Sequence, residues 1–287
     1  MASLLSVENL QVQFQTKKGI NTAVDGVSFS VEKGRILGIV GESGCGKSVT
    51  SMSILQLLGS NARISGGSIK LDGKELIGLP EKEMCRIRGN DIAMIFQDPM
   101  TALNPTLTIG TQLMEPIMLH QNCGKKEAWT RAVDVLKRVG IAAPEKRMKE
   151  YPHQLSGGMR QRVMIAMAVS CEPRLLIADE PTTALDVTIQ AQILELMCEL
   201  REKMGTAIML ITHDMGVVAE TADDVLVLYA GKAVEYGSIE DIFERPKHPY
   251  TQGLLSAIPR ITKERKPLST IEGMVPNPVE RIKGCRF

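Results

Sequence analysis

Residues Gly41-Glu42-Ser43-Gly44-Cys45-Gly46-Lys47-Ser48 fit the pattern Gly-x4-Gly-Lys-Ser/Thr, which cradles the phosphates of nucleotides. Residues 35–40, just before it, are mostly apolar and predict a buried strand, whereas residues 49–58 carry apolar side chains at the spacing of a helix. Strand, loop and helix form the context that the motif requires. A glycine-rich turn without a ligand is the alternative, but it would not need these flanking elements, so we expect a bound triphosphate.

The fixed positions of this loop each have a physical task. The glycines let the backbone curl so that successive N–H groups point inward, and the N-terminus of the following helix adds positive potential. Lys47 is expected to reach the β- and γ-phosphates, and the Ser48 hydroxyl to ligate Mg2+. Cys45 occupies a variable position where the backbone does the binding, so we expect its thiol to be inert.

The composition of the chain excludes several classes of partner. With 34 basic and 33 acidic residues, the net charge of +1 gives no broad field for nucleic acid or anionic lipid, and 3% aromatic residues argue against base stacking. No apolar run approaches the roughly 18 residues that span a bilayer, and the N-terminus lacks the pattern of a signal peptide. The six cysteines are scattered. We therefore expect a soluble intracellular chain with reduced thiols and without a zinc site.

The apolar pattern predicts two kinds of structure around the loop. Alternation between residues 5 and 40 predicts antiparallel strands, residues 64–73 predict a further hairpin, and residues 92–96 predict a short core strand that ends at Gln97. From residue 98 to about residue 154 the pattern becomes helical and predicts an inserted helical subdomain. One apolar stripe of that subdomain consists of Ala128, Ala132, Val135, Leu136 and Val139.

Two later apolar runs, at residues 175–177 and 207–211, flank a segment of helical spacing from Thr188 to Met204. Strand, helix and strand in this order predict a parallel sheet, and ligands bind at the carboxyl ends of such strands. The adjacent acids Asp179 and Glu180 close the first strand. One acid of such a pair supports Mg2+ and its neighbour orients a water toward the γ-phosphate, whereas an acidic helix cap is the alternative interpretation.

A second helix start also suits an anion. Residues 155–162 read Leu-Ser-Gly-Gly-Met-Arg-Gln-Arg, so that Ser-Gly-Gly opens a helix whose first backbone N–H groups are free. At this point the order of the pieces resembles the nucleotide-binding subunits of ABC transporters. The matching motifs are the Walker A loop at residues 41–48, the Q-loop glutamine Gln97, the Leu-Ser-Gly-Gly-x-x-Gln signature at residues 155–161, the Walker B acids Asp179 and Glu180, the D-loop Ala184-Leu185-Asp186 and the H-loop histidine His213.

The resemblance implies an α/β fold, a P-loop NTPase of the ABC type with a mixed sheet core, an antiparallel β subdomain and an inserted helical subdomain. It implies that ATP, with Mg2+, is sandwiched between the phosphate loop of one subunit and the Ser156-Gly157-Gly158 helix of the facing subunit. The implied catalytic residues are Glu180, His213 and Gln97, the implied metal ligands are Ser48, Gln97 and Asp179, and the implied nucleotide-binding residues are Phe14, Gly41, Glu42, Ser43, Gly44, Cys45, Gly46, Lys47, Ser48, Val49, Ser156, Gly157, Gly158, Gln161 and Asp186.

Phe14 is the best-placed candidate for the aromatic residue that usually stacks on adenine in this family, although core packing in a strand explains it equally well. A finer resemblance comes from residues 95–105, 151–155 and 245–259, which look like the dipeptide/oligopeptide/nickel importer branch. The last segment could also be an ordinary surface helix punctuated by prolines. Non-transport members of the superfamily carry coiled-coil insertions or two such domains, and fused exporters carry membrane spans; none of these occurs in this sequence.

The resemblance implies that the chain hydrolyses ATP to drive uptake of di- or oligopeptides, or of nickel or another metal chelate, at the cytoplasmic face of the membrane. The implied partners are a second ABC ATPase subunit, usually a paralogue, two transmembrane permease subunits and an extracytoplasmic solute-binding protein, with no nucleic acid. Two other functions stay open. They are a soluble ATP-driven switch acting on nucleic acid or ribosomes, against which the balanced charge argues, and an export subunit, against which residues 245–259 argue.

We predict a nucleotide-binding domain over residues 1–240, with its helical subdomain at about residues 98–172, and a C-terminal extension over residues 241–287. In this branch the tail often continues into a cysteine cluster that can hold an iron–sulfur centre. This sequence has one cysteine there, Cys285, and one cysteine cannot hold such a cluster. The sequence leaves open whether the extension is naturally short or truncated.

Overall fold

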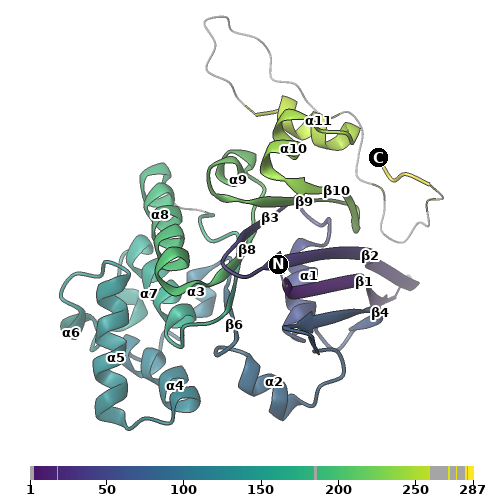
Figure 1. Cartoon of the computed structure of the whole chain (residues 1–287). Helices are drawn as coiled ribbons and strands as arrows, with labels where there is room; N and C mark the ends of the chain where they lie inside the picture. Colours follow the sequence, from purple (N-terminus) through teal and green to yellow (C-terminus); the bar gives the residue numbers. More distant parts are fainter. Residues whose placement is uncertain are drawn as a thin grey trace, which may run out of the picture. The chain divides into compact units, whose positions relative to one another are not determined.

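The computed structural model describes residues 3–17, 19–183, 186–258, 271, 276, 282 and 284–287 (Figure 1). The chain divides into two compact units. Unit 1 comprises residues 1–79 and 209–287, and unit 2 comprises residues 80–208. Ala184 and Leu185 of the predicted D-loop, and most of the predicted extension beyond residue 258, lie outside the described residues.

Unit 1 combines two groups of strands with short helices. Its elements are β1 (Ser3–Thr16), β2 (Gly19–Glu32), β3 (Ile36–Val40), α1 (Lys47–Ile54), β4 (Ala62–Leu71), β5 (Lys74–Glu75), most of β8 (Ala207–Ile211), α9 (Met215–Thr221), β9 (Asp224–Tyr229), β10 (Lys232–Ser238), α10 (Ile239–Glu244) and α11 (Pro249–Ser256). The helix after the phosphate loop therefore begins two residues before the predicted residue 49 and ends four before the predicted residue 58.

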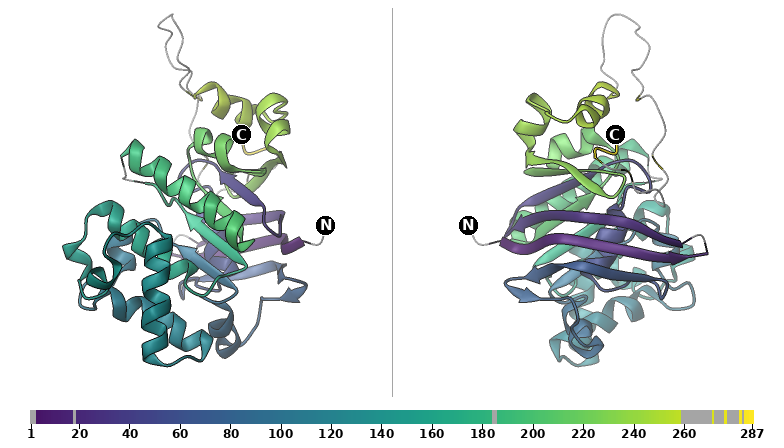
Figure 2. Two further views of the ribbon diagram at one scale, coloured as in Figure 1. Left: turned by 60° about the vertical axis from the view of Figure 1, so that its left-hand side comes forward. Right: turned by 90° about the vertical axis from the view of Figure 1, so that its right-hand side faces the viewer.

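The antiparallel sheet of unit 1 has the strand order β2-β1-β4-β5, which confirms the predicted antiparallel elements (Figure 2). In β1, Leu5 and Val7 are buried, and then Leu10 and Val12. The change of parity comes from a register shift between Val7 and Leu10, where Asn9 has a positive φ of 48°. Such a bulge adds one residue to one strand, so the apolar side chains stay on the buried face on both sides of it.

The second group of strands in unit 1 has the order β10-β9-β3-β8. β3 pairs in parallel with β9, in the register Gly38 with Val225, whereas β9 and β10 are antiparallel, so the pairing is mixed as expected. Every residue of β3 is buried, which explains its continuous apolar sequence. Gly38 is needed because a Cβ at this position would lie 2.9 Å from the side chain of Val218 on α9.

Unit 2 contains most of the helices. Its elements are α2 (Glu81–Ile87), β6 (Ile92–Ile95), α3 (Pro99–Ala102), α4 (Ile109–Gln121), α5 (Lys125–Arg138), α6 (Pro144–Arg147), the 3-10 helix η1 (Pro152–Gln154), α7 (Gly157–Val169), β7 (Leu175–Asp179), α8 (Val187–Met204) and the first residues of β8. β6 and β7 pair in parallel, with Ile92 opposite Leu175. The two strands expected before the polar residues Gln97 and Asp179 are therefore present, and the structure adds that they are neighbours.

Helices α4, α5 and α7 gather together in unit 2 (Figure 1). The predicted stripe explains this packing, because all five of its members are buried: Ala128, Ala132, Val135, Leu136 and Val139. Residues three and four apart lie on one face of a helix, so α5 presents a continuous apolar surface to its neighbours. The helices expected from residue 98 onward are present, while the exact limits of a separate helical subdomain stay a prediction.

We predict that the core of unit 1 is sensitive to truncation in β3. Ile39 is fully buried, so Ile39→Ala should lower the free energy of unfolding by about 2–5 kcal/mol, because it removes apolar contacts and leaves a cavity. Urea-induced unfolding measures this change. Ile20→Ala is the matched control, because Ile20 is 47% exposed and its truncation should change stability by less than about 0.5 kcal/mol. Equal effects of the two substitutions would contradict the assignment of β3 to the core.

Candidate functional site

The phosphate loop connects the carboxyl end of β3 to the first residue of α1. Gly46 is the N-cap of α1, with φ 106°, and no side chain among the described residues caps the helix there. The backbone N–H groups of the first turn are therefore left for a ligand, and the helix dipole makes that end attractive to an anion. Gly41 and Gly44 also have positive φ, 151° and 79°, which L side chains rarely adopt.

The rear of this loop is packed against backbone. A Cβ at Gly41 would lie 2.2 Å from the carbonyl oxygen of Leu228, and a Cβ at Gly46 would lie 2.8 Å from that of Ala23. At Gly44, by contrast, a Cβ would meet no described atom within 4 Å. Glycine is thus required for close packing at Gly41 and Gly46, and at Gly44 it is favoured by its positive φ alone.

Lys47 lies within the loop with only 6% of its surface exposed. Its Nζ donates to the carbonyl oxygen of Gly41 at 2.6 Å and to that of Glu42 at 3.1 Å. A buried ammonium group is costly unless it is paired, so these carbonyls hold the cation in place. The donor set of ammonium group, exposed Ser48 hydroxyl and uncapped helix N-terminus fits the phosphates of a nucleotide.

Cys45 is the buried thiol of the loop. Burial raises the pKa of this thiol, and the nearby Lys47 ammonium opposes that change only in part. The neutral thiol is therefore strongly favoured at neutral pH, in line with the expectation that Cys45 is chemically inert.

The acid predicted for catalysis lies at the carboxyl end of β7. Asp179 is the last residue of that strand and is 5% exposed, and the half-buried Glu180 follows with a left-handed φ of 47°. Gln97 Nε2 donates to Glu180 Oε2 at 2.9 Å, and the Thr183 hydroxyl donates to the same oxygen, also at 2.9 Å. The structure thus brings together Gln97 and Glu180, two residues that the resemblance implied to be catalytic, and it adds Thr183, which no sequence pattern had indicated.

The predicted signature begins helix α7. Ser156 is its N-cap and accepts a hydrogen bond from the N–H of Met159 at 3.4 Å. Gly157 is exposed, and a Cβ there would meet no described atom within 4 Å. Gln161 behaves differently, because it is 2% exposed and its amide donates to the carbonyl oxygen of Pro181. Its side chain joins α7 to the turn after β7, and its predicted contact with nucleotide stays a prediction.

A hollow of about 530 Å³ lies beside the signature in unit 2, with Ser156, Gly157, Gly158 and Asp186 among its lining residues. Asp186 is the N-cap of α8, and its Oδ1 accepts from the N–H of Ile189 at 3.0 Å. Arg147 and Arg162 also line the hollow, where Arg147 is paired with Glu150 and Arg162 donates to the carbonyl oxygen of Val139 at 2.6 Å. The starts of α7 and α8 therefore line one hollow.

His213 is exposed and follows β8 in unit 1. Its neighbour Thr212 donates its backbone N–H to the carbonyl oxygen of Ile39 at 3.1 Å, so His213 lies two residues beyond the end of β8, the strand next to β3. Asp214 then begins α9 and accepts from the N–H of Gly216 at 2.8 Å. These contacts fix the backbone beside His213 relative to the strand that leads into the phosphate loop.

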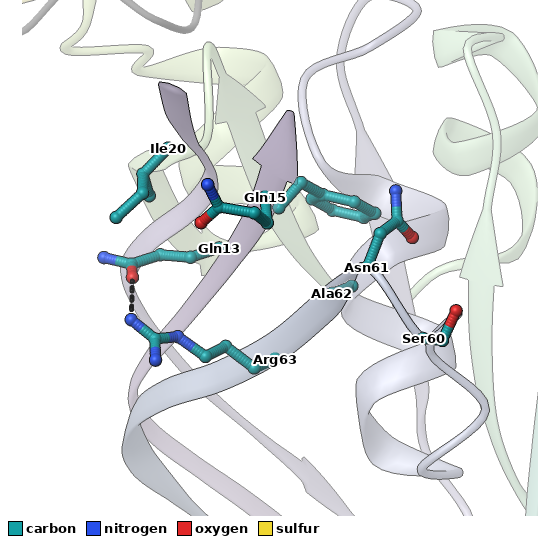
Figure 3. Close-up of a pocket in the computed structure, with 8 residues that line it drawn as sticks. Gln13, Gln15, Ile20, Ser60, Asn61, Ala62 and Arg63 are labelled. Atoms are coloured by element: carbon teal, nitrogen blue, oxygen red, sulfur yellow. Dashed lines mark hydrogen bonds between the residues drawn. The ribbon is translucent and has the colours of Figure 1, made fainter. Parts of the chain in front are cut away.

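Phe14 lies in β1, half-buried, and lines a small hollow of about 170 Å³. Figure 3 shows this hollow between the ends of β1 and β2 and the segment of Ser60 to Arg63, with Gln13 and Arg63 joined by a hydrogen bond of 3.4 Å. Phe14 is thus neither fully buried core nor a freely exposed ring. Its contact with adenine stays a prediction.

The predicted site residues fall into two sets. Unit 1 holds the phosphate loop, Phe14 and His213, and unit 2 holds Gln97, the two acids, the signature and Asp186. Mg2+ favours oxygen ligands and is often bound by few carboxylates together with substrate phosphates. The hydroxyl, amide and carboxylate of Ser48, Gln97 and Asp179 match that chemistry. The described part of the chain contains no cluster of three or more His, Cys, Asp or Glu side chains that could hold a metal by itself.

The sequence matches two known protein families. Residues 24–183 match the family described as ABC transporter, and residues 234–287 match the family described as oligopeptide/dipeptide transporter, C-terminal region. In the described residues, no helix has the length and apolar character needed to cross a bilayer.

Three relatives illustrate the similarity. The oligopeptide transport ATP-binding protein AppD of Bacillus subtilis (strain 168) is 57% identical, over 100% of this chain and 88% of its own length. The dipeptide transport ATP-binding protein DppD of the same organism is 55% identical, over 100% and 86%. The oligopeptide transport ATP-binding protein OppD of Escherichia coli (strain K12) is 54% identical, over 99% and 84%.

Among solved structures, a dimeric post-hydrolysis state of the ATP-binding cassette MJ0796 bound to ADP and Pi superposes with a TM-score of 0.73. It is 27% identical, and the match covers 82% of this chain and 98% of that structure. This structural similarity confirms the expected α/β fold of an ABC cassette with an inserted helical subdomain.

We predict that thiol reagents distinguish the loop cysteine from the surface cysteines. Cys85 and Cys285 are exposed, whereas burial raises the pKa of both Cys45 and Cys171, so these two form little thiolate at neutral pH. Because the raised pKa is passed only at alkaline pH, their labelling should stay slow at neutral pH and accelerate as the pH rises. Mass spectrometry of peptides from iodoacetamide-treated protein measures each rate. Labelling of Cys45 as fast as Cys85 at neutral pH would contradict this geometry.

Proposed function

Because the chain belongs to the ABC transporter family and to its oligopeptide and dipeptide ATP-binding branch, we propose that it powers the uptake of di- and oligopeptides by hydrolysing ATP. The observation that carries the proposal is the phosphate loop of unit 1, whose buried Lys47 and uncapped helix N-terminus form a site for a triphosphate. The named relatives are peptide transport proteins, which favours peptides over nickel or another chelate as the cargo.

The residues of unit 1 bind the nucleotide in this proposal. The backbone N–H groups of the first turn of α1 and the Lys47 ammonium hold the phosphates, and the exposed His213 holds the γ-phosphate. Ser48, Gln97 and Asp179 would hold Mg2+, which neutralises developing charge on the phosphate oxygens when bound. Phe14 supports the adenine ring.

The residues of unit 2 supply the acid–base chemistry. Glu180 accepts a proton from the attacking water or orients it, and Gln97 helps place that water, because its amide already lies 2.9 Å from Glu180 Oε2. Thr183 holds the same carboxylate oxygen and so limits its rotation. Ser156 and Gly157, at the start of α7, contact the nucleotide bound by a facing subunit.

The proposal includes the partners that such chemistry requires. A second ABC ATPase, a paralogue or another copy of this chain, supplies the opposite half of each nucleotide site. Two transmembrane permease subunits carry the cargo, and an extracytoplasmic solute-binding protein delivers it, so that the chain works at the cytoplasmic face of the membrane. The match to the oligopeptide/dipeptide transporter C-terminal region and the balanced charge of the chain favour this role over one on nucleic acid or ribosomes, or in export.

We predict that Glu180→Gln separates ATP binding from hydrolysis. The substitution keeps the size of the side chain but removes the base, and such groups contribute about 10²–10⁴-fold to rate, so hydrolysis should fall by that factor while ATP affinity stays the same. Phosphate release and equilibrium ATP binding measure the two quantities. Glu195→Gln is the matched control, because Glu195 is an exposed carboxylate on α8 of the same unit and should leave both unchanged. Turnover of Glu180→Gln within tenfold of wild type would remove Glu180 from this role.

We predict that Gly157→Asp shows whether the start of α7 acts on the nucleotide bound by a facing subunit. A Cβ at Gly157 meets no described atom within 4 Å, so the lone chain should fold normally and bind ATP with unchanged affinity. Hydrolysis should fall by about 10²–10³-fold, because a carboxylate now repels the phosphates that the start of α7 is meant to stabilise. ATP binding by the monomer and hydrolysis by the assembled transporter are measured separately.

The control for Gly157→Asp is Gly124→Asp. Gly124 also lies at the start of a helix in unit 2, as the N-cap of α5, and a Cβ there also meets no described atom within 4 Å. Gly124→Asp should leave hydrolysis unchanged. Loss of ATP affinity by the monomeric Gly157→Asp protein would argue against a role across the subunit interface.

A further inference from the structure

A buried tyrosine of the C-terminal segment contacts the phosphate loop. Tyr250 lies in the first turn of α11 and is fully buried within unit 1. Its hydroxyl oxygen accepts a hydrogen bond from the backbone N–H of Glu42 at 3.1 Å, across 208 residues of sequence. Glu42 is the second residue of the phosphate loop. Tyr250 therefore joins a helix of the segment that matches the peptide-transporter C-terminal family to the loop that grips the nucleotide.

One peptide group connects this hydroxyl to Lys47. The peptide bond between Gly41 and Glu42 is planar, so its carbonyl oxygen and its N–H group rotate together. The N–H group donates to Tyr250, and the carbonyl oxygen, that of Gly41, accepts from Lys47 Nζ at 2.6 Å. By fixing the orientation of this peptide plane, Tyr250 therefore also directs the Gly41 carbonyl oxygen toward the Lys47 ammonium group.

The ring of Tyr250 is itself held on several sides. Its centroid lies 4.6 Å from that of Tyr229, the last residue of β9, and 5.5 Å from that of Phe287. Arg286 fixes the segment before Phe287, because it donates to the carbonyl oxygen of Ala230 and pairs with Asp25 at 2.5 Å. Aromatic pairs of this kind leave the ring little freedom, so the hydroxyl is aimed at the loop by packing.

Other contacts show that the same region supports the loop from behind. The N–H of Gly231 donates to the carbonyl oxygen of Cys45 at 3.0 Å, and the carbonyl of Leu228 lies against Gly41. These two contacts come from the backbone of β9 and the turn after it. The contact with Glu42 comes instead from a side chain, so it can be removed without changing the backbone. Burial also raises the pKa of the Tyr250 phenol, so the hydroxyl stays neutral.

We propose that Tyr250 is a positioning residue for the phosphate loop, and that the C-terminal segment sets the affinity for nucleotide through its hydroxyl. The inference rests on the proposed function, since it assumes that the loop binds ATP. It assigns to the segment matched over residues 234–287 a task in nucleotide binding that is separate from recognition of the cargo.

The test is Tyr250→Phe in the full chain, with MgATP binding measured by isothermal titration calorimetry. The substitution keeps the ring packing and deletes one hydrogen bond, which corresponds to a rise in Kd of about two- to tenfold. The unfolding temperature should stay close to that of wild type. In the assembled transporter KM for ATP should rise by a similar factor with kcat unchanged, because the loop grips ground state and transition state alike.

Tyr236→Phe is the matched control. Tyr236 lies on β10 of the same unit, and its hydroxyl donates to the carbonyl oxygen of Ser30 on β2 at 3.2 Å rather than contacting the phosphate loop. This variant also loses a tyrosine hydrogen bond to the backbone, although an exposed one, and should bind MgATP as wild type does.

Three results would overturn the inference while wild type binds MgATP. They are an unchanged Kd for Tyr250→Phe, an equal loss of affinity in Tyr236→Phe, and a loss of affinity that comes with a matching loss of folding stability. Failure of the wild-type chain to bind MgATP would instead contradict the proposed function itself, so the two failures are distinguishable.

Discussion

The conformation of the phosphate loop is constrained by its close contact with the backbone carbonyl of Leu228. Gly41 lies so near the carbonyl of Leu228 that any Cβ would collide with it. The parallel register of β3 with β9, in which Val40 lies opposite Val227, sets this approach. The loop conformation is therefore a consequence of strand pairing, which supports the curled backbone that suits phosphate.

In unit 2, a turn after β7 and two side-chain hydrogen bonds position the carboxylate of Glu180. β7 is buried along its whole length, and the chain turns immediately after Asp179, with Glu180 in the left-handed region. A non-glycine residue held in this region costs about 1–3 kcal/mol, and such strain is often found at functional sites. Hydrogen bonds from Gln97 and Thr183 to the Glu180 carboxylate, and the bond from Thr183 N–H to the Glu180 carbonyl, offset that cost. The residues around this turn therefore hold the Glu180 carboxylate in place, although the turn strains the backbone of Glu180.

The sequence predicted the elements whose pattern is local and continuous. The buried strand of residues 36–40, the loop after it, the stripe of α5 and the acids after β7 all follow from runs or spacings of a few residues. The limits of α1 were wrong, because apolar Leu57 and Leu58 continue the helical spacing beyond Ile54, where the helix ends and Gln56 takes a positive φ. The bulge at Asn9 gave no signal either, since it changes the parity of an otherwise regular strand.

The residues that sequence reasoning missed act through contacts that are distant or that carry no motif. Thr183 is a single threonine in a turn, and only its distance to Glu180 gives it a role. Tyr250 lies in a segment whose prolines indicated a surface helix, and its partner Glu42 is far away in the sequence. The amide of Gln161 donates to the carbonyl oxygen of Pro181, a contact that no motif indicated, while its expected contact with nucleotide stays a prediction. Each of these depends on tertiary packing, which periodicity does not record.

The central claim is that the loop of one subunit binds the nucleotide, while cleavage requires the signature of a facing subunit. The most direct measurement is the rate of ATP hydrolysis per chain across a dilution series, for the chain alone and mixed with its paralogue, with sedimentation recording the assembled fraction. The account predicts that this rate falls on dilution in step with the assembled fraction, although ATP remains bound to single chains. A constant rate per chain in a sample that contains only single chains would contradict it.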